Sequence, residues 1–302
     1  MSHDEELTRL RLTGPIAQVE GLVELWESGL PPGDKTGWPS LDRHYTVAPG
    51  QVTIVTGWPS SGKSEWLDAM LVNLARQNWH FAMFSPENQP VRIHIAKMME
   101  KWSGKPFGDG PNERLTSEEV RKYAQELGRH FCFMQAENGG CSPESVLTTA
   151  NDYLRAVGGK HGLIIDPWNE LEHWRPHGLS ETEYISKTLS LIRNWARSSG
   201  VHVWIVAHPQ KLRRDDAGKL PLPTPDSISG SAHFWNKADA ALTVWRDLSD
   251  LQSQDVSIYV QKVRFKHIGR IGKVDLQWDR VTGRYHEPLS KLGAVTYGKH
   301  KE

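Results

Sequence analysis

Cysteine is scarce in this 302-residue sequence, and its scarcity excludes two kinds of cross-linked domain. Only Cys132 and Cys141 occur, and they form no C-x-x-C pair. Two isolated thiols provide neither a disulfide framework nor the ligands of a structural zinc site. We therefore expect both thiols to be reduced, with a bridge between them as the less favoured alternative, and the protein to work in the cytoplasm.

Long apolar runs and an excess of one charge are also missing. No stretch approaches the ~20 apolar residues that a membrane-spanning helix needs, and residues 1–10 are too charged for a signal peptide. The 36 basic residues balance 36 acidic ones. We expect no membrane partner, and any contact with nucleic acid must come from a local basic patch.

Short apolar strands alternate with helical patterns through the first two thirds of the chain. The strands are expected at 52–56, 81–84, 131–134, 163–165 and 201–207, and the helices at 64–77, 91–102, 117–127, 143–157 and 181–198. Capping boxes open two of these helices, at Thr116 with Glu119 and at Ser180 with Glu183. The alternation predicts an α/β fold with a mostly parallel sheet flanked by helices.

The last third has a different pattern. Strands are expected at 241–245, 256–265 and 274–278 with few helices between them. Such a run predicts antiparallel strands added at the C-terminal edge of the sheet.

The chain is expected to divide into three parts, namely an N-terminal segment 1–35, a main domain 36–290 and a tail 291–302. In the first part Ile16, Val19, Val23 and Trp26 recur at three- and four-residue steps, as on one face of a short helix. That apolar face needs a partner, which is either its own domain or a neighbouring subunit.

The most specific motif is a phosphate-binding loop. Residues 57–64 read GWPSSGKS, which matches G-x-x-x-x-G-K-[ST] between an expected strand and an expected helix. In such a loop the backbone N–H groups and the helix N-terminus bind phosphate, the lysine reaches the β- and γ-phosphates, and the hydroxyl binds Mg²⁺. The motif predicts ATP and Mg²⁺ as ligands. The expected nucleotide contacts are Gly57, Ser60, Ser61, Gly62, Lys63 and Ser64.

Three polar residues follow the ends of other expected strands. Asp166 ends an apolar strand and is expected to hold Mg²⁺ with Ser64, although an aspartate there is often only a turn residue. Glu87 is a candidate general base for the attacking water, or else a solvated loop glutamate. His208 is a candidate γ-phosphate sensor, or else a hydrogen-bonded structural histidine.

Lys262 and Arg264 project from one face of a late strand, since they are two residues apart. Two cations on one face require an anionic partner, and a nucleotide phosphate is one. From spacing alone, a surface strand with solvated charges is the favoured interpretation.

These motifs in this order resemble the ring-shaped replicative helicases of the DnaB and Twinkle type, including the helicase halves of bacteriophage primase–helicases. The resemblance covers residues 36–288 and rests on the phosphate loop, on SPE at 85–87, ID at 165–166 and AHP at 207–209. Its most distinctive part is SGSAHFWNKAD at 229–239, followed by KVRF at 262–265. It implies a RecA-like ATPase core in a motor that moves 5′-to-3′ on single-stranded DNA and unwinds duplex as a ring, expected to be a hexamer.

The resemblance also implies roles for single residues. Glu87 would be the catalytic base, and His208 would couple the state of the γ-phosphate to the DNA-binding loop. Arg264 would be an arginine finger for the ATP of the next subunit, with Lys262 beside it. Asn236 stands where the family usually has a glutamine near the γ-phosphate.

Two further elements are assigned by the resemblance. Trp278 would stack on the nucleotide base, with a core tryptophan as the alternative. The loop 211–230 would line the central channel and bind the DNA backbone. Its expected DNA contacts are Lys211, Arg213, Arg214, Lys219 and Gly230.

Partners follow from the same resemblance. We expect single-stranded DNA, further copies of the chain, and a primase domain or protein with a DNA polymerase. Only about 35 residues precede the ATPase part, so the chain is either the helicase portion of a longer protein or a reduced stand-alone form. The rival functions are a RecA- or RadA-like recombinase and a regulatory P-loop ATPase that does not translocate.

Overall fold

The computed structural model describes residues 12–136, 140–210, 220–228, 232–250 and 252–288. It divides into two compact units, residues 1–32 and 33–302. The first unit contains the 3-10 helix η1 (Pro15–Gln18) and the helix α1 (Val19–Ser28), which together confirm the expected N-terminal helix. None of the residues in these two elements is buried.

The second unit is built on one sheet. Its order is β3-β2-β4-β5-β1-β6-β7-β8-β9. The strands from β3 to β6 are parallel, and β7, β8 and β9 continue the sheet antiparallel, as the sequence predicts. The bounds are β1 (Val52–Thr56), β2 (Trp79–Phe84), β3 (Phe131–Met134), β4 (Lys160–Ile165), β5 (His202–Val206), β6 (Ala240–Trp245), β7 (Asp255–Val263), β8 (Gly272–Trp278) and β9 (Tyr285–His286).

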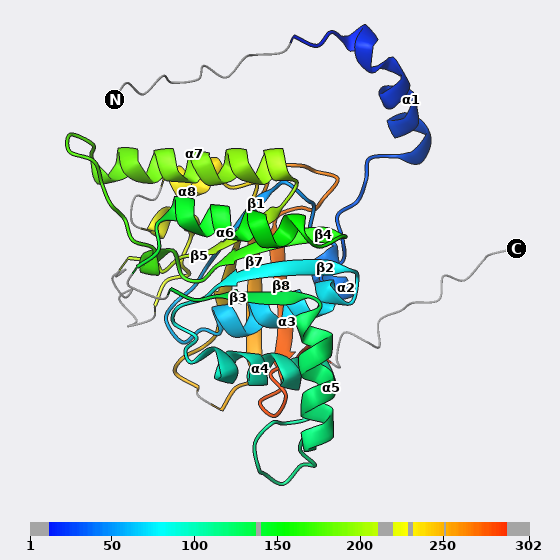
Figure 1. The fold of residues 1–302 in the computed structure, drawn as a ribbon, viewed down its shortest axis with the longest axis vertical. Helices are drawn as coiled ribbons and strands as arrows, with labels where there is room; N and C mark the ends of the chain where they lie inside the picture. Colours follow the sequence, from blue (N-terminus) through cyan, green and yellow to red (C-terminus); the bar gives the residue numbers. More distant parts are fainter. Residues whose placement is uncertain (1–11, 137–139, 211–219, 229–231, 251, 289–302) are drawn as a thin grey trace, which may run out of the picture. The chain divides into compact units, whose positions relative to one another are not determined.

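Helices cover both faces of the sheet. In Figure 1, α3, α4 and α5 lie on one side of it and α6, α7 and α8 on the other. Their bounds, with those of the short elements, are α2 (Pro39–Asp42), α3 (Lys63–Ala75), α4 (Val91–Ser103), α5 (Ser117–Gly128), α6 (Pro143–Arg155), η2 (Trp168–Glu170), α7 (Glu181–Ser199), η3 (Pro225–Ser227) and α8 (Ala232–Lys237). Both expected capping boxes are present, at the starts of α5 and α7.

The central strand β1 separates two apolar cores. Val52 and Ile54 pack into the core beneath α6 and α7, whereas Val55 packs into the core beneath α3 and α4. Because both faces of β1 are covered, its five residues are all buried, which explains the unbroken β-branched run in the sequence. The phosphate loop that follows β1 is thereby held at the middle of the sheet edge.

Several details differ from expectation or were not foreseen. β2 begins two residues early, at Trp79, because this fully buried side chain pairs in register with Lys160 of β4. The helix α8 was not expected.

Cys132 and Cys141 are free, as predicted. Among the described residues, no helix combines the length and apolar character that crossing a bilayer requires.

Candidate nucleotide site and subunit-interface residues

At two positions, the backbone of the phosphate loop favours glycine over any residue with a side chain. Gly57 and Gly62 have φ values of 151° and 89°, in the region that favours glycine. A Cβ at Gly57 would come within 2.3 Å of the carbonyl oxygen of Val244. The Lys63 ammonium is buried and donates to the carbonyls of Gly57 and Trp58, each at 3.0 Å. The loop therefore curls around its own lysine.

The chemistry of this loop fits a phosphate ligand. Burial lowers the pKa of Lys63 to about 8, against the opposing charges of Asp166 and Glu87. A bound phosphate would stabilise the charged ammonium and offset the free-energy cost of burying it. Ser61 Oγ is also buried and has no hydrogen-bond partner among the described residues. A loop with an undercompensated cation and a free hydroxyl is suited to bind the phosphates of a nucleotide.

A hydroxyl and a carboxylate meet beside the loop. Asp166 follows β4, is buried, and accepts a hydrogen bond from the Ser64 hydroxyl. Burial raises the pKa of Asp166 to about 6, and the charges of Asp68 and Glu87 add to the rise, while Ser64 and Lys63 oppose it. A divalent cation would reverse this shift. The Ser64 hydroxyl and the Asp166 carboxylate are oxygen donors that fit Mg²⁺, which takes few protein ligands and the substrate phosphates.

Glu87 and His208 face each other across neighbouring strand ends. His208 Nε2 lies 3.7 Å from Glu87 Oε1, and the backbone N–H of His208 donates to Asn169 Oδ1 at 3.4 Å. Burial and the charge of Lys63 lower the pKa of His208, although Glu87 opposes them. The Glu87 side chain is 50% exposed, so water has access to it. The structure thus places Glu87, His208, Lys63 and Asp166 together, as expected.

Arg264 lies at the other end of the sheet. Its Nε is 2.8 Å from Oδ1 of Asp239, whose Oδ2 accepts from the N–H of Val52 at 3.1 Å. Val52 starts β1 and Gly57 follows its end, so at roughly 3.3 Å per residue about 16 Å of strand separates them. Arg264 therefore cannot reach phosphates bound to its own loop.

Two expected ligand-binding residues lie beside Arg264. Lys262 Nζ donates to the carbonyl of Trp235 and lies 5.7 Å from its ring centre. Burial and the neighbouring charge of Arg264 lower the pKa of Lys262. The carbonyl of Asn236 accepts from Arg264 Nη2 at 3.0 Å. Asn236 therefore belongs with Lys262 and Arg264, and not with the phosphate loop of its own chain.

Trp278 lies on the phosphate-loop side. It ends β8, which runs in the same direction as β1, and it pairs with Tyr285 of β9. The Tyr285 hydroxyl would lie 3.3 Å from a Cβ at Gly62. The guanidinium of Arg246 stands 5.3 Å from the Trp278 ring centre. The ring is partly buried, packs against the apolar core beneath α3 and α4, and lies at the same edge of the sheet as the phosphate loop.

Some residues of the site were not singled out from the sequence. Asp239 gives a weak signal, as the last residue before a strand. Tyr285 gives none, because its approach to Gly62 depends on the order of the strands. The expected DNA contacts Lys211, Arg213, Arg214, Lys219 and Gly230 lie outside the described residues.

This sheet order and phosphate loop define a RecA-like P-loop ATPase. A family model, the DnaB-like helicase C terminal domain, matches residues 33–287, and the chain belongs to that family. It is also 42% identical over 263 residues to the Twinkle homolog protein, chloroplastic/mitochondrial, of Arabidopsis thaliana. That match covers 84% of this chain and 36% of the relative, so the chain spans about a third of the relative's length.

Two solved structures share the fold. The first, described as an ATPase domain, superimposes with a TM-score of 0.72 over 90% of this chain and 98% of its own. The second, a DnaB-like replicative helicase described together with its interactions with primase, superimposes with a TM-score of 0.73 over 90% of this chain and 68% of its own. Each is 19% identical to this sequence, so the two likenesses establish the fold alone.

Proposed function

We propose that this chain is the motor of an ATP-dependent replicative DNA helicase, which moves on single-stranded DNA and unwinds duplex as a ring. The observation that carries the proposal is the division of the catalytic groups between two ends of the sheet. Lys63, Asp166 and Glu87 gather at one end, and Arg264 lies about 16 Å of strand away. A complete site then needs two copies of the chain.

The chemistry at the loop end is ATP hydrolysis. The backbone of the loop and Lys63 would bind the β- and γ-phosphates, and Ser64 and Asp166 would hold Mg²⁺, which neutralises charge on the phosphates. Glu87 would accept the proton of the attacking water. The imidazole of His208, with its lowered pKa, would be neutral near pH 7 and so able to donate or accept one hydrogen bond towards Glu87 or the γ-phosphate.

The remaining residues would act across the subunit interface. Arg264, with Lys262 and Asn236 beside it, would approach the γ-phosphate held by the next subunit. The apolar residues of η1 and α1 would dock on a neighbouring copy, since Ile16 and Trp26 are 89% and 84% exposed. The basic residues of the loop 211–230 would bind the DNA backbone inside the ring. The 5′-to-3′ direction and the hexamer follow from the family resemblance.

Two rival functions predict different behaviour. Family membership favours the helicase over a recombinase, which would form open filaments visible by electron microscopy. A regulatory ATPase would hydrolyse ATP at a rate that DNA does not change.

A primase and a DNA polymerase remain proposed partners. The cytoplasm remains our proposed compartment and fits the two free cysteines, although the Arabidopsis relative is named for chloroplasts and mitochondria.

The test combines three measurements on the purified chain: ATP turnover, its stimulation by a long single-stranded DNA, and the mass of the assembly. We expect turnover that DNA stimulates and a ring-sized mass. A monomer whose ATP turnover ignores DNA would contradict the proposal.

A further inference from the structure

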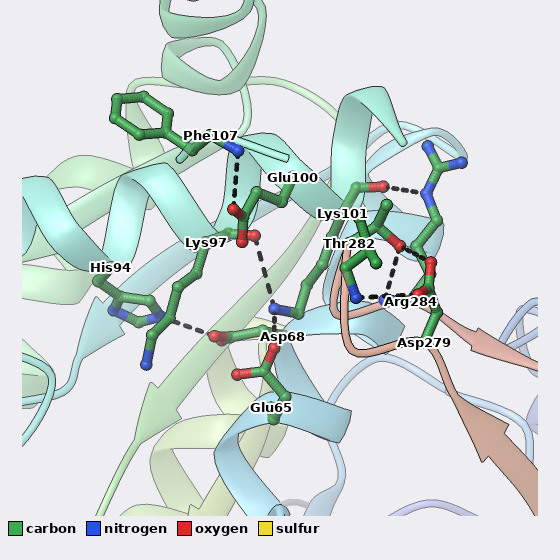
Figure 2. Close-up of polar contacts among 11 residues, drawn as sticks. Glu65, Asp68, His94, Lys97, Glu100, Lys101, Phe107, Asp279, Thr282 and Arg284 are labelled. Atoms are coloured by element: carbon green, nitrogen blue, oxygen red, sulfur yellow. Dashed lines mark hydrogen bonds and ion pairs between the residues drawn. The ribbon is translucent and has the colours of Figure 1, made fainter. Parts of the chain in front are cut away.

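Two ion pairs, one buried and one partly buried, join α3 to α4 on the side of the phosphate loop. Lys101 Nζ lies 2.5 Å from Glu65 Oε1, and His94 Nε2 lies 2.8 Å from Asp68 Oδ2. The side chains of Lys101 and His94 are each 1% exposed. Figure 2 shows both carboxylates of α3 pointing towards these two side chains of α4.

The spacing of the two pairs fixes how the helices meet. Glu65 and Asp68 are one turn apart on α3, and His94 and Lys101 are two turns apart on one face of α4. One pair would allow α4 to rotate about the contact. Two pairs at different points along the helix restrict both its rotation and its sliding.

The far end of α4 is held as well. Arg284, which follows the turn after β8, donates from Nε to the carbonyl of Lys101 at 2.7 Å and from Nη2 to that of Trp102 at 2.8 Å. Arg76, which follows the end of α3, donates to the same Trp102 carbonyl at 2.7 Å. Both guanidiniums lie at the C-terminus of α4, where the helix dipole favours positive charge. The helix is thus held to α3 and its C-terminal cap at His94, Lys101 and Trp102, and to the segment before β9 at its own C-terminus.

These contacts lie between two parts of the catalytic site. Lys63 and Ser64 begin α3, directly before Glu65. Glu87 belongs to the segment of six residues between β2 and α4. Because that segment is short, the position of α4 relative to α3 sets the position of Glu87 relative to Lys63.

Stability alone does not explain the choice of charged residues here. Apolar side chains of similar volume often stabilise a fold as much as a buried ion pair or more, but they lack its directional contacts. Burial opposes a charge on His94, yet Asp68 and Asp166 together raise the pKa of this imidazole, against the like charge of Lys101. Phe133, which packs edge-on against the imidazole, carries no charge.

We propose that His94 and Lys101, through Asp68 and Glu65, are positioning residues that hold the catalytic carboxylate Glu87 at its working distance from the phosphate loop. This assignment depends on the proposed role of Glu87 in ATP hydrolysis. None of the four is among the groups proposed to bind the nucleotide or activate the water. Their loss acts on the geometry of the reaction and leaves nucleotide binding by the loop intact.

The test compares two lysine variants. Lys101→Met removes a buried lysine paired with Glu65, and Lys105→Met removes a half-buried one paired with Glu113 and Glu119. We expect Lys101→Met to lower kcat by about tenfold to a hundredfold, the scale of a misplaced catalytic group, with KM for ATP changed less than about twofold. Amide hydrogen exchange in residues 85–97 should become faster. Lys105→Met should leave kcat, KM and the exchange at their wild-type values.

A second pair of variants covers the case that Lys101→Met does not fold. His94→Gln keeps a donor for Asp68 and should retain most of the turnover, whereas His94→Leu should not. The proposal is overturned if folded His94→Leu or Lys101→Met protein keeps the wild-type kcat and the wild-type exchange of residues 85–97. If the wild type itself does not hydrolyse ATP, the proposed function fails, and the exchange measurement still decides whether these residues hold the Glu87 segment.

Discussion

Arg264 Nε lies 2.8 Å from Oδ1 of the buried Asp239, and Arg193 and Arg197 of α7 approach the same oxygen at 3.6 and 3.7 Å. One carboxylate thus faces three guanidiniums, which leaves a local excess of positive charge. Such a cluster is suited to receive an anion, and the strand geometry excludes the phosphates of the same chain. The expected anion is a nucleotide held by another copy.

This relationship gives a complementation experiment. Lys63→Ala and Arg264→Ala should each hydrolyse ATP far more slowly than the wild type, since an arginine finger contributes roughly 10³–10⁵-fold to kcat in related motors. A mixture of the two variants should recover part of the turnover. In mixed rings, some interfaces join an intact phosphate loop on one subunit to an intact arginine on the next.

The measurement is steady-state ATP turnover at a fixed total subunit concentration, while the ratio of the two variants is changed. Recovery should be greatest near equal amounts. A mixture no more active than its components, in assemblies shown by native mass spectrometry to contain both variants, would place Arg264 outside the reaction. Arg264→Lys should hydrolyse ATP little faster than Arg264→Ala, because an ammonium does not reproduce the planar fork of a guanidinium.

Trp278 allows a separate test of base stacking. Trp278→Ala should raise KM for ATP about tenfold and leave kcat nearly unchanged, since stacking on an aromatic ring contributes about 1–3 kcal/mol per base. Trp278→Phe should keep most of the affinity, because it retains an aromatic face. If Trp278→Ala lowers the melting temperature and leaves KM unchanged, the ring is a core residue.

The sequence predicted local features of this fold better than distant ones. The boxes Thr116 with Glu119 and Ser180 with Glu183 identified two helix starts, because capping is a contact over three residues. The glycine spacing identified the phosphate loop for the same reason. Spacing also grouped Lys262 with Arg264, although β7 ends at Val263, so Arg264 lies one residue beyond the strand.

The spacing of residues in the sequence does not determine which strands are neighbours in the sheet. The pairing of β7 with β6 brings Arg264 to Asp239 and away from Gly57, and the pairing of β9 with β8 brings Tyr285 to Gly62. Both outcomes depend on contacts between segments far apart in the chain. The separation of the two catalytic ends, on which the proposed ring rests, could therefore be read only from the structure.

The exposed apolar residues of η1 and α1 predict how the ring is held. The double variant Ile16→Ser with Trp26→Ser should lower the assembly mass towards that of a monomer, because it removes apolar surface available to a neighbouring copy. Glu20→Ser with Glu24→Ser is the matched control on the same helix and should leave the mass unchanged.

Sedimentation velocity measures the mass in both cases. The melting temperature should stay close to the wild-type value, since neither Ile16 nor Trp26 belongs to an apolar core. ATP turnover should fall together with the mass, because the sites would be separated from Arg264. A ring-sized mass in the Ile16 and Trp26 variant would show that α1 does not hold the assembly.

His202 predicts how stability depends on pH. This residue begins β5, and its imidazole is fully buried, where Nδ1–H donates to the carbonyl of Ala48 and Nε2 accepts from the Thr53 hydroxyl. Burial lowers its pKa to about 4, while the hydrogen bond with Ala48 opposes that shift. Between pH ~6.5 and ~4 the unfolded chain therefore binds a proton at His202 that the folded protein excludes, so stability falls as the pH falls.

The expected loss from His202 alone is about 3 kcal/mol in the free energy of unfolding across that window, and none above pH ~6.5. Asp166 titrates in the same range with the opposite sign, because burial raises its pKa. The comparison that isolates His202 is therefore between the wild type and His202→Gln, by urea denaturation at several pH values. His202→Gln should lose less stability on acidification. Parallel curves for the two proteins would show that the buried imidazole does not control acid stability.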